Sequence, residues 1–238
     1  MASILDRYGI KEVADVTFYE INDDGTPGAP VLYLDTLKVS TIEQTAEQAE
    51  ARGGKGNPPL IIWDYGKEIN ITLQDALFSI KSMAVMFGDP NVGNISSLRR
   101  TQSFTGTTAP TQYELPSGGF YTIATSTIYD ETGATVESLK SGHIYYQTFD
   151  MTVKGNEIEI SAGTFPGTYY ITGDTYARSE TTGKDEFFQF IIPKAKVASE
   201  NTITMEAEGD PSVFDMNLRV MRPADGKMMK LIKYDVTV

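Results

Sequence analysis

Short runs of alternating residues, each closed by a turn signal, recur along nearly the whole chain and constrain its fold more than any other feature. In residues 13–21, Val16 and Phe18 alternate with Asp15 and Thr17. The run ends at Asn-Asp-Asp-Gly, a sequence typical of turns. Many short strands with tight turns predict a mainly β fold, an antiparallel β-sandwich or barrel. The other predicted strands span residues 31–39, 60–73, 120–129, 144–153, 157–160, 168–176, 187–192, 201–208, 213–221 and 228–236.

Two neighbouring segments give different predictions from their residues alone. Residues 60–73 predict a strand, whereas the Ala, Glu and Gln content of residues 40–51 favours a helix. The glycines and prolines of residues 52–59 predict a flexible loop between them. Because side chains alternate along a strand, we expect the odd-numbered apolar residues of 60–73 on one face. These residues are Trp63, Tyr65, Ile69 and Ile71.

One segment predicts an α-helix that flanks the sheets. Thr72 precedes Asp75 by three residues, as in a capping box, and Gly88 and Pro90 follow as a stop signal. The sequence therefore predicts a helix over residues 74–87. Its apolar face is expected to pack on a sheet through Leu77, Phe78, Met83 and Phe87.

The domain organisation follows from length and patterning. A chain of 238 residues can form one large domain, and no internal repeat divides it. We expect a single β domain over residues 1–238, with an insertion or a long loop around residues 89–150. Residues 89–116 are the least patterned stretch and are rich in Thr, Ser, Asn and Gly.

Composition excludes several function classes. The net charge is −12, which disfavours binding to nucleic acid or to anionic membranes, because both depend on Lys and Arg. The chain has no cysteine and a single histidine, His143, so disulfides, thiol nucleophiles and multi-histidine zinc sites are excluded. The first residues lack the apolar stretch of a signal peptide, which predicts a protein made in the cytoplasm.

No constellation of residues predicts catalysis, a cofactor or a metal ion. The glycine-rich loop at Lys55 lacks the spacing of a nucleotide-binding loop, and Val31 stands where a calcium-binding loop starting at residues 22–25 would need glutamate. Acids two residues apart on a strand, such as Glu157 with Glu159, are typical of a solvated sheet face. The expectation is a binding or assembly protein without enzymatic activity.

Three segments resemble bacteriophage tail tube proteins. They read ARGGKGNPPLIIWDYGKEINITLQDAL (residues 51–77), FFQFIIPKAK (187–196) and TMEAEGDPSVFDM (204–216). The resemblance implies a β-sandwich flanked by a helix. Six subunits would form a ring, and stacked rings would form a tube that conducts DNA during ejection. It also implies that residues 38–63 form a long β-hairpin reaching the neighbouring ring, in place of a helix over residues 40–51.

The resemblance also implies partners and a location. The partners would be other copies of the chain and further tail proteins such as sheath or baseplate. The location would be the virion tail, assembled in the cytoplasm of a bacterial host. Two alternatives remain at this point: another virion structural protein, such as a head decoration or connector protein, and a glycan-binding β-sandwich with tyrosine-lined loops.

Two groups of residues are the candidate sites for this function. We expect a loop rich in glycine and carrying two cations to join rings; it consists of Arg52, Gly53, Gly54, Lys55, Gly56 and Asn57. A channel for DNA should repel phosphate, and six chains of −12 would carry 6 × −12 = −72. The candidate acids of the channel wall are Glu157, Glu159, Glu206 and Glu208.

Overall fold

The computed structural model describes residues 7–10, 12–89, 92–200 and 213–234, and these residues form antiparallel strands and one short helix. The predicted mainly β class with one flanking helix is therefore confirmed. The chain divides into two compact units. Unit 1 comprises Met1–Asn91 and Ile158–Val238, and unit 2 comprises Val92–Glu157.

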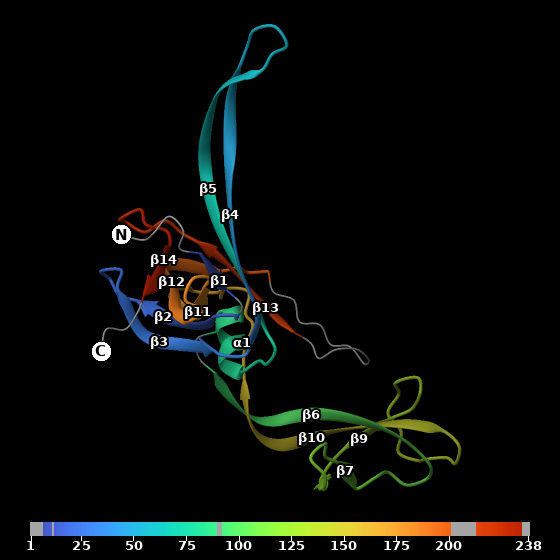
Figure 1. Ribbon diagram of the computed structural model, residues 1–238. Coiled ribbons are helices and arrows are strands. Elements are labelled where there is room, and N and C mark those ends of the chain that lie inside the picture. Colours follow the sequence, from blue (N-terminus) through green and yellow to red (C-terminus); the bar gives the residue numbers. More distant parts are fainter. Residues whose placement is uncertain (1–6, 11, 90–91, 201–212, 235–238) are drawn as a thin grey trace. The chain divides into compact units, whose positions relative to one another are not determined.

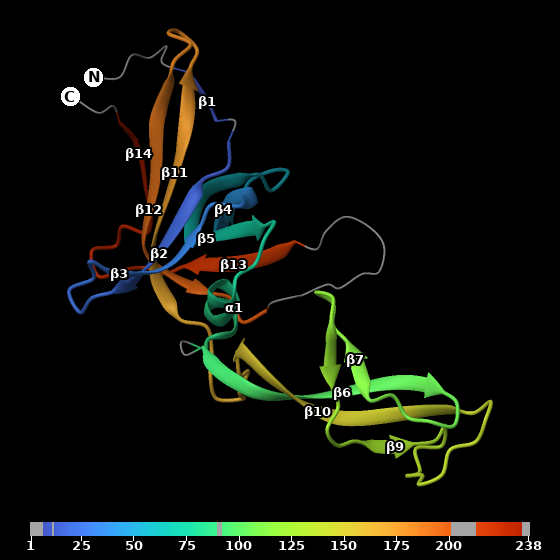
Figure 2. The ribbon, with the colours of Figure 1, turned by 90° about the horizontal axis from the view of Figure 1, so that it is seen from below.

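Unit 1 contains a nine-stranded sheet, with the order β3-β2-β11-β12-β13-β5-β4 along its main path (Figure 1). Two short strands extend it, since β1 pairs with β11 and β14 pairs with β12. Figure 2 shows β11, β12 and β14 side by side. The strands are β1 (Tyr8–Ile10), β2 (Asp15–Ile21), β3 (Pro27–Leu34), β4 (Leu37–Arg52), β5 (Pro59–Asp75), β11 (Thr168–Ser179), β12 (Asp185–Val197), β13 (Phe214–Val220) and β14 (Lys230–Tyr234).

This sheet folds over so that its two halves share one core. β3 and β4 lie at opposite ends of the strand order, yet only Asp35 and Thr36 separate them in the chain. Side chains from both halves meet in one buried apolar cluster, and no described strand pair closes the sheet into a barrel. The cluster includes Val16, Phe18, Ile71, Leu73, Ile171, Ile192 and Leu218.

The helix of unit 1 is shorter than predicted. α1 spans Ile80–Phe87, because β5 continues to Asp75 and Ser79 supplies the N-cap. Ser79 and Ser82 form the capping box, and Gly88 ends the helix at φ +81°. Val85 and Met86 pack in the core. The predicted packing face is therefore wrong at its first two positions, Leu77 and Phe78, which are exposed.

Unit 2 is built on a long strand pair. β6 (Gly93–Thr105) pairs with β10 (Ile144–Glu157), β9 (Thr127–Tyr129) lies beside β10, and β7 (Gln112–Glu114) pairs with β8 (Phe120–Thr122). One face of β10 is buried, through Tyr145, Gln147, Phe149 and Met151. Residues 89–116, expected to be a long loop or the boundary of an insertion, include the start of unit 2 at Val92 and the strand β6, whose polar residues lie on a solvated face.

Three further strand predictions need correction. The run at residues 31–39 is split, because β3 ends at Leu34 and β4 begins at Leu37. The run at 120–129 is likewise two strands, β8 and β9. Residues 158–160 are not in a strand, since β10 ends at Glu157. The run at 201–208 lies outside the described residues.

Candidate assembly surface on the β4–β5 hairpin

The most exposed structure of unit 1 is the hairpin of β4 and β5, which rises from the sheet in Figure 1. The strands have 16 and 17 residues, and only their bases are buried. Residues 41–50 and 59–68 are all exposed. At about 3.3 Å per residue, the exposed part of β5 is roughly 30 Å long. The helix favoured by the composition of residues 40–51 is wrong, and the hairpin implied by the resemblance is confirmed.

A β-bulge divides the hairpin into a base and a free part. Thr45 pairs with Glu68 and Glu47 pairs with Tyr65, so β5 has one residue more than β4 at this point. Gly66 adopts φ +62°, which a glycine-type bulge requires. The extra residue reverses the alternation of β5. Odd-numbered side chains lie on the core side of the sheet between the bulge and the base, and on the opposite side between the bulge and the tip.

This reversal places the aromatic residues of β5 on the face opposite to the core. Ile69 and Ile71 are buried at 4% and 1% exposure, whereas Trp63 and Tyr65 are 53% and 52% exposed. The prediction that these four residues share one face is therefore wrong. The bond from Gln48 Nε2 to Asp64 Oδ1, 2.9 Å long, lies on the other face of the free hairpin.

The exposed aromatic residues belong to a continuous apolar surface. Ile61 and Trp63 pair across the strands with Ala51 and Ala49, so all four share one face with Tyr65. We call these residues the apolar stripe: Ala49, Ala51, Ile61, Trp63 and Tyr65. Large apolar side chains gathered on a solvent-exposed face are typical of a protein–protein contact.

The six residues predicted to join rings lie together at the tip of the hairpin. Gly54, Gly56 and Asn57 have φ of +85°, +86° and +50°, and Asn57 N donates to Gly54 O over 3.1 Å. Arg52 forms an ion pair of 2.5 Å with Glu50. Lys55 takes part in no ion pair within the described ranges, so it presents an unneutralised cation.

The structure places two of the predicted channel acids, Glu157 and Glu159, in different units. Glu157 is the last residue of β10 in unit 2, whereas Glu159 follows in unit 1 outside any strand. The backbone N–H of Glu159 donates to Asp89 Oδ2 over 3.1 Å. Glu206 and Glu208 lie outside the described residues. The expected face with Glu157 and Glu159 on one strand is therefore wrong.

A polar sheet face lies at the base of the hairpin, and it was not predicted from the sequence. Opposite the core, β4, β5 and β13 present side chains that are almost all polar, with Val39 as the apolar exception. Thr72 Oγ1 and Asn217 Oδ1 are 3.0 Å apart, and Arg219 pairs with Glu68. The alternation of apolar and polar residues over 69–74 could have predicted this polar face. This polar face consists of Thr41, Glu43, Thr45, Glu68, Asn70, Thr72, Gln74, Asp215, Asn217 and Arg219.

The described residues were also searched for a metal site and for a membrane-spanning helix. They hold no group of three His, Asp or Glu side chains placed to bind a metal ion. Within the same ranges, no helix is long and apolar enough to cross a membrane.

Comparison with known proteins places the chain in a family. The model of the YomU/Tube protein family matches residues 8–233. The tail tube protein of Bacillus phage SPR is 30% identical over 80 residues, which are 34% of this chain and 28% of that protein. The matched part is thus less than a third of the relative's length. The resemblance to phage tail tube proteins is confirmed, and the chain belongs to the YomU/Tube protein family.

Proposed function

We propose that copies of this chain form rings that stack into the hollow tube of a phage tail, through which DNA passes during ejection. The observation that carries the proposal is the exposed hairpin with its apolar stripe, in a chain that belongs to a tube protein family. An isolated chain gains nothing from exposing Trp63 and Tyr65, whereas a subunit buries such residues on assembly.

The hairpin tip contacts the neighbouring ring in this proposal. Its glycines let the loop adopt the left-handed conformations seen at Gly54 and Gly56, and Lys55 offers a cation in an acidic chain. The free outer edges of β3 and β4 supply backbone groups for joining subunits within a ring. Six subunits per ring is the number implied by the resemblance.

The channel wall is acidic in this proposal, since cations on it would bind the phosphates of passing DNA and carboxylates repel them. A net charge of −12 per chain supports this. The polar face of β4, β5 and β13 joins the four predicted acids as a candidate for the wall, because it suits contact with water. On it, Glu43 and Asp215 form no ion pair among the described residues.

The location and partners follow from the same role. We place the protein in the virion tail, assembled in the host cytoplasm, with sheath or baseplate proteins as further partners. The family match favours this role over a head decoration or connector protein and over a glycan-binding protein. No enzymatic step is part of the proposal.

Negative-stain electron microscopy of the purified full chain tests the proposal. We expect hollow stacked rings of constant diameter. A protein that stays monomeric at high concentration, in conditions that preserve its fold, would overturn it.

A further inference from the structure

We propose that the exposed turn of Leu77 and Phe78 is the surface that receives the apolar stripe of a second copy of this chain. The inference rests on the proposed function, because it names the surface that the hairpin contacts when rings stack. We call the turn the acceptor turn.

The acceptor turn displays two large apolar side chains to solvent. Leu77 is 65% exposed and Phe78 is 53% exposed. The ring of Phe78 lies 4.5 Å from that of buried Phe214, so Phe214 supports it from beneath. Apolar side chains exposed on a firm support are the usual anchors of an interface.

Hydrogen bonds on both sides fix the backbone of this turn. Asp75 Oδ1 accepts from Leu77 N over 3.2 Å, and Thr36 O accepts from Ala76 N over 3.1 Å. On the other side, Ser79 begins the capping box of α1. The turn is therefore pre-organised, and docking there needs little further ordering.

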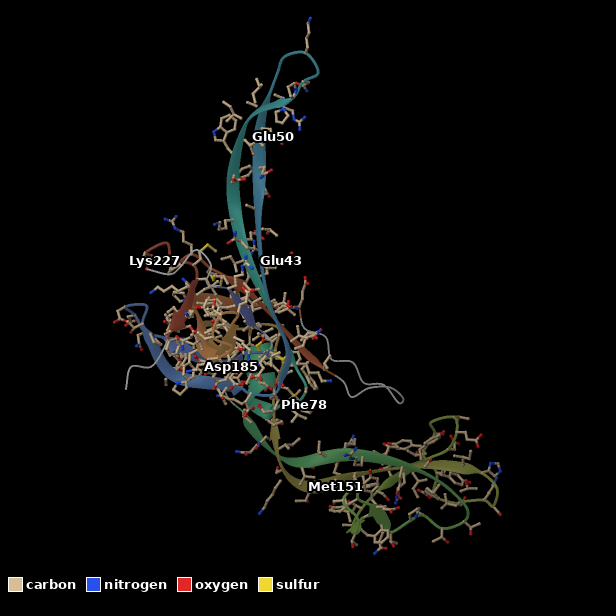
Figure 3. All side chains as sticks on the ribbon, in the orientation of Figure 1. Glu43, Glu50, Phe78, Met151, Asp185 and Lys227 are labelled. Carbon is tan, nitrogen blue, oxygen red and sulfur yellow. The ribbon has the colours of Figure 1, made fainter. Side chains whose placement is uncertain are left out.

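The acceptor turn and the hairpin tip lie at opposite ends of unit 1. Figure 3 labels Phe78 below the sheet and Glu50 near the tip of the hairpin. The stripe of one copy therefore cannot cover its own acceptor turn, whereas a second copy placed head to tail can. Contacts between two different surfaces of identical chains give an open-ended stack when the rotation between copies does not close a ring, and a tube requires such a stack.

The surface area of the contact indicates how strong a single contact is. Three half-exposed side chains such as Ile61, Trp63 and Tyr65 offer roughly 300 Å² of surface. A stable pair of proteins buries about 800 Å² on each partner. One stripe on one acceptor turn is therefore a weak contact, and it becomes strong only when several copies in a ring engage together.

Cross-linking tests the contact directly, because the chain has no cysteine of its own. In tubes of the double variant Ile61→Cys/Leu77→Cys, oxidation should give a ladder of covalent multimers. The matched control is Ile62→Cys/Leu77→Cys, since Ile62 is as exposed as Ile61, at 51%, but lies on the other face of the hairpin. An equal ladder from both, or none from the first, would overturn the inference.

Substitution supplies a second test. Leu77→Ser and Trp63→Ser should each leave the melting temperature unchanged and block elongation of the tube. A mixture of the two should stop at pairs of rings, because only one kind of junction remains intact. If wild type forms tubes and Leu77→Ser tubes reach normal length, this inference alone fails. If wild type forms no tubes, the proposed function fails and the inference fails with it.

Discussion

Gly173 on β11 lies directly opposite Phe190 on β12, and the ring of Phe190 occupies the space that a side chain at position 173 would need. Both residues are buried in the core of unit 1. The glycine is thus required by the close approach of an aromatic ring from the neighbouring strand.

Gly173→Ala should therefore lower the free energy of unfolding by about 1–3 kcal/mol, through overpacking of the core. Thermal unfolding measures this as a fall in Tm. Gly163→Ala is the control, because a Cβ there meets nothing within 4 Å and its φ is not positive. Equal Tm values for both variants would contradict the packing described for Phe190.

Deletion of Gly66 should remove the bulge and turn Trp63 and Tyr65 to the other face of the hairpin. The core lies at the base, so we expect a folded protein that no longer forms tubes. Gly66→Asn keeps the residue count and tolerates a positive φ, so it should still assemble. Circular dichroism and electron microscopy check the two properties separately; normal tubes from the deletion would refute this reading of the hairpin.

Deletion of residues 53–56 shortens the tip loop. The strands remain paired through the rest of β4 and β5, so the subunit should stay folded but fail to elongate. Removing Gly118 and Gly119 from the turn between β7 and β8 in unit 2 is the control. Tube length measured by microscopy decides the matter, and full-length tubes without the loop would count against its role.

Glu43→Lys tests the channel wall. If the polar face lines the channel, tubes should assemble, but phage carrying the variant should release their DNA more slowly, because lysines bind phosphate. The control is Glu114→Lys in unit 2, which is exposed on β7. Release followed with a fluorescent DNA dye gives the rate, and unchanged release by Glu43→Lys would exclude this face as the wall.

Removal of unit 2 tests whether it is an inserted module. Gly93 pairs with Glu157, so the two ends of the segment lie side by side. A short Gly-Ser linker in place of residues 92–157 should leave unit 1 folded, with cooperative thermal unfolding. A shortened chain that aggregates or unfolds without cooperativity would show that unit 1 depends on the segment.

The sequence predicted those strands in which apolar and polar residues alternate and the apolar ones are buried. β2 and β10 were found because Val16, Phe18 and Phe149 alternate with exposed residues. β6 was missed because its exposed residues are mostly Ser, Thr and Arg. The helix was predicted to start too early because Leu77 and Phe78 suggested a helical face.

The candidate site was only partly predictable, for two physical reasons. The tip loop was located by its glycines, which are needed for positive φ. The face of the apolar stripe could not be predicted, because a single extra residue at Gly66 reverses it and alternation alone does not reveal a bulge. Residues 40–51 form a strand despite their helix propensity, because β5 pairs along their whole length.

The placement of the apolar stripe and the acceptor turn at opposite ends of one unit has a consequence for growth. In the proposed stacking, each ring that docks covers one set of acceptor turns and presents an identical new set, so addition has no built-in stopping point. Because every junction is identical, the contact cannot set the number of rings. A tail of defined length therefore requires a separate component that measures it, and we expect the purified chain alone to form tubes with a broad distribution of lengths.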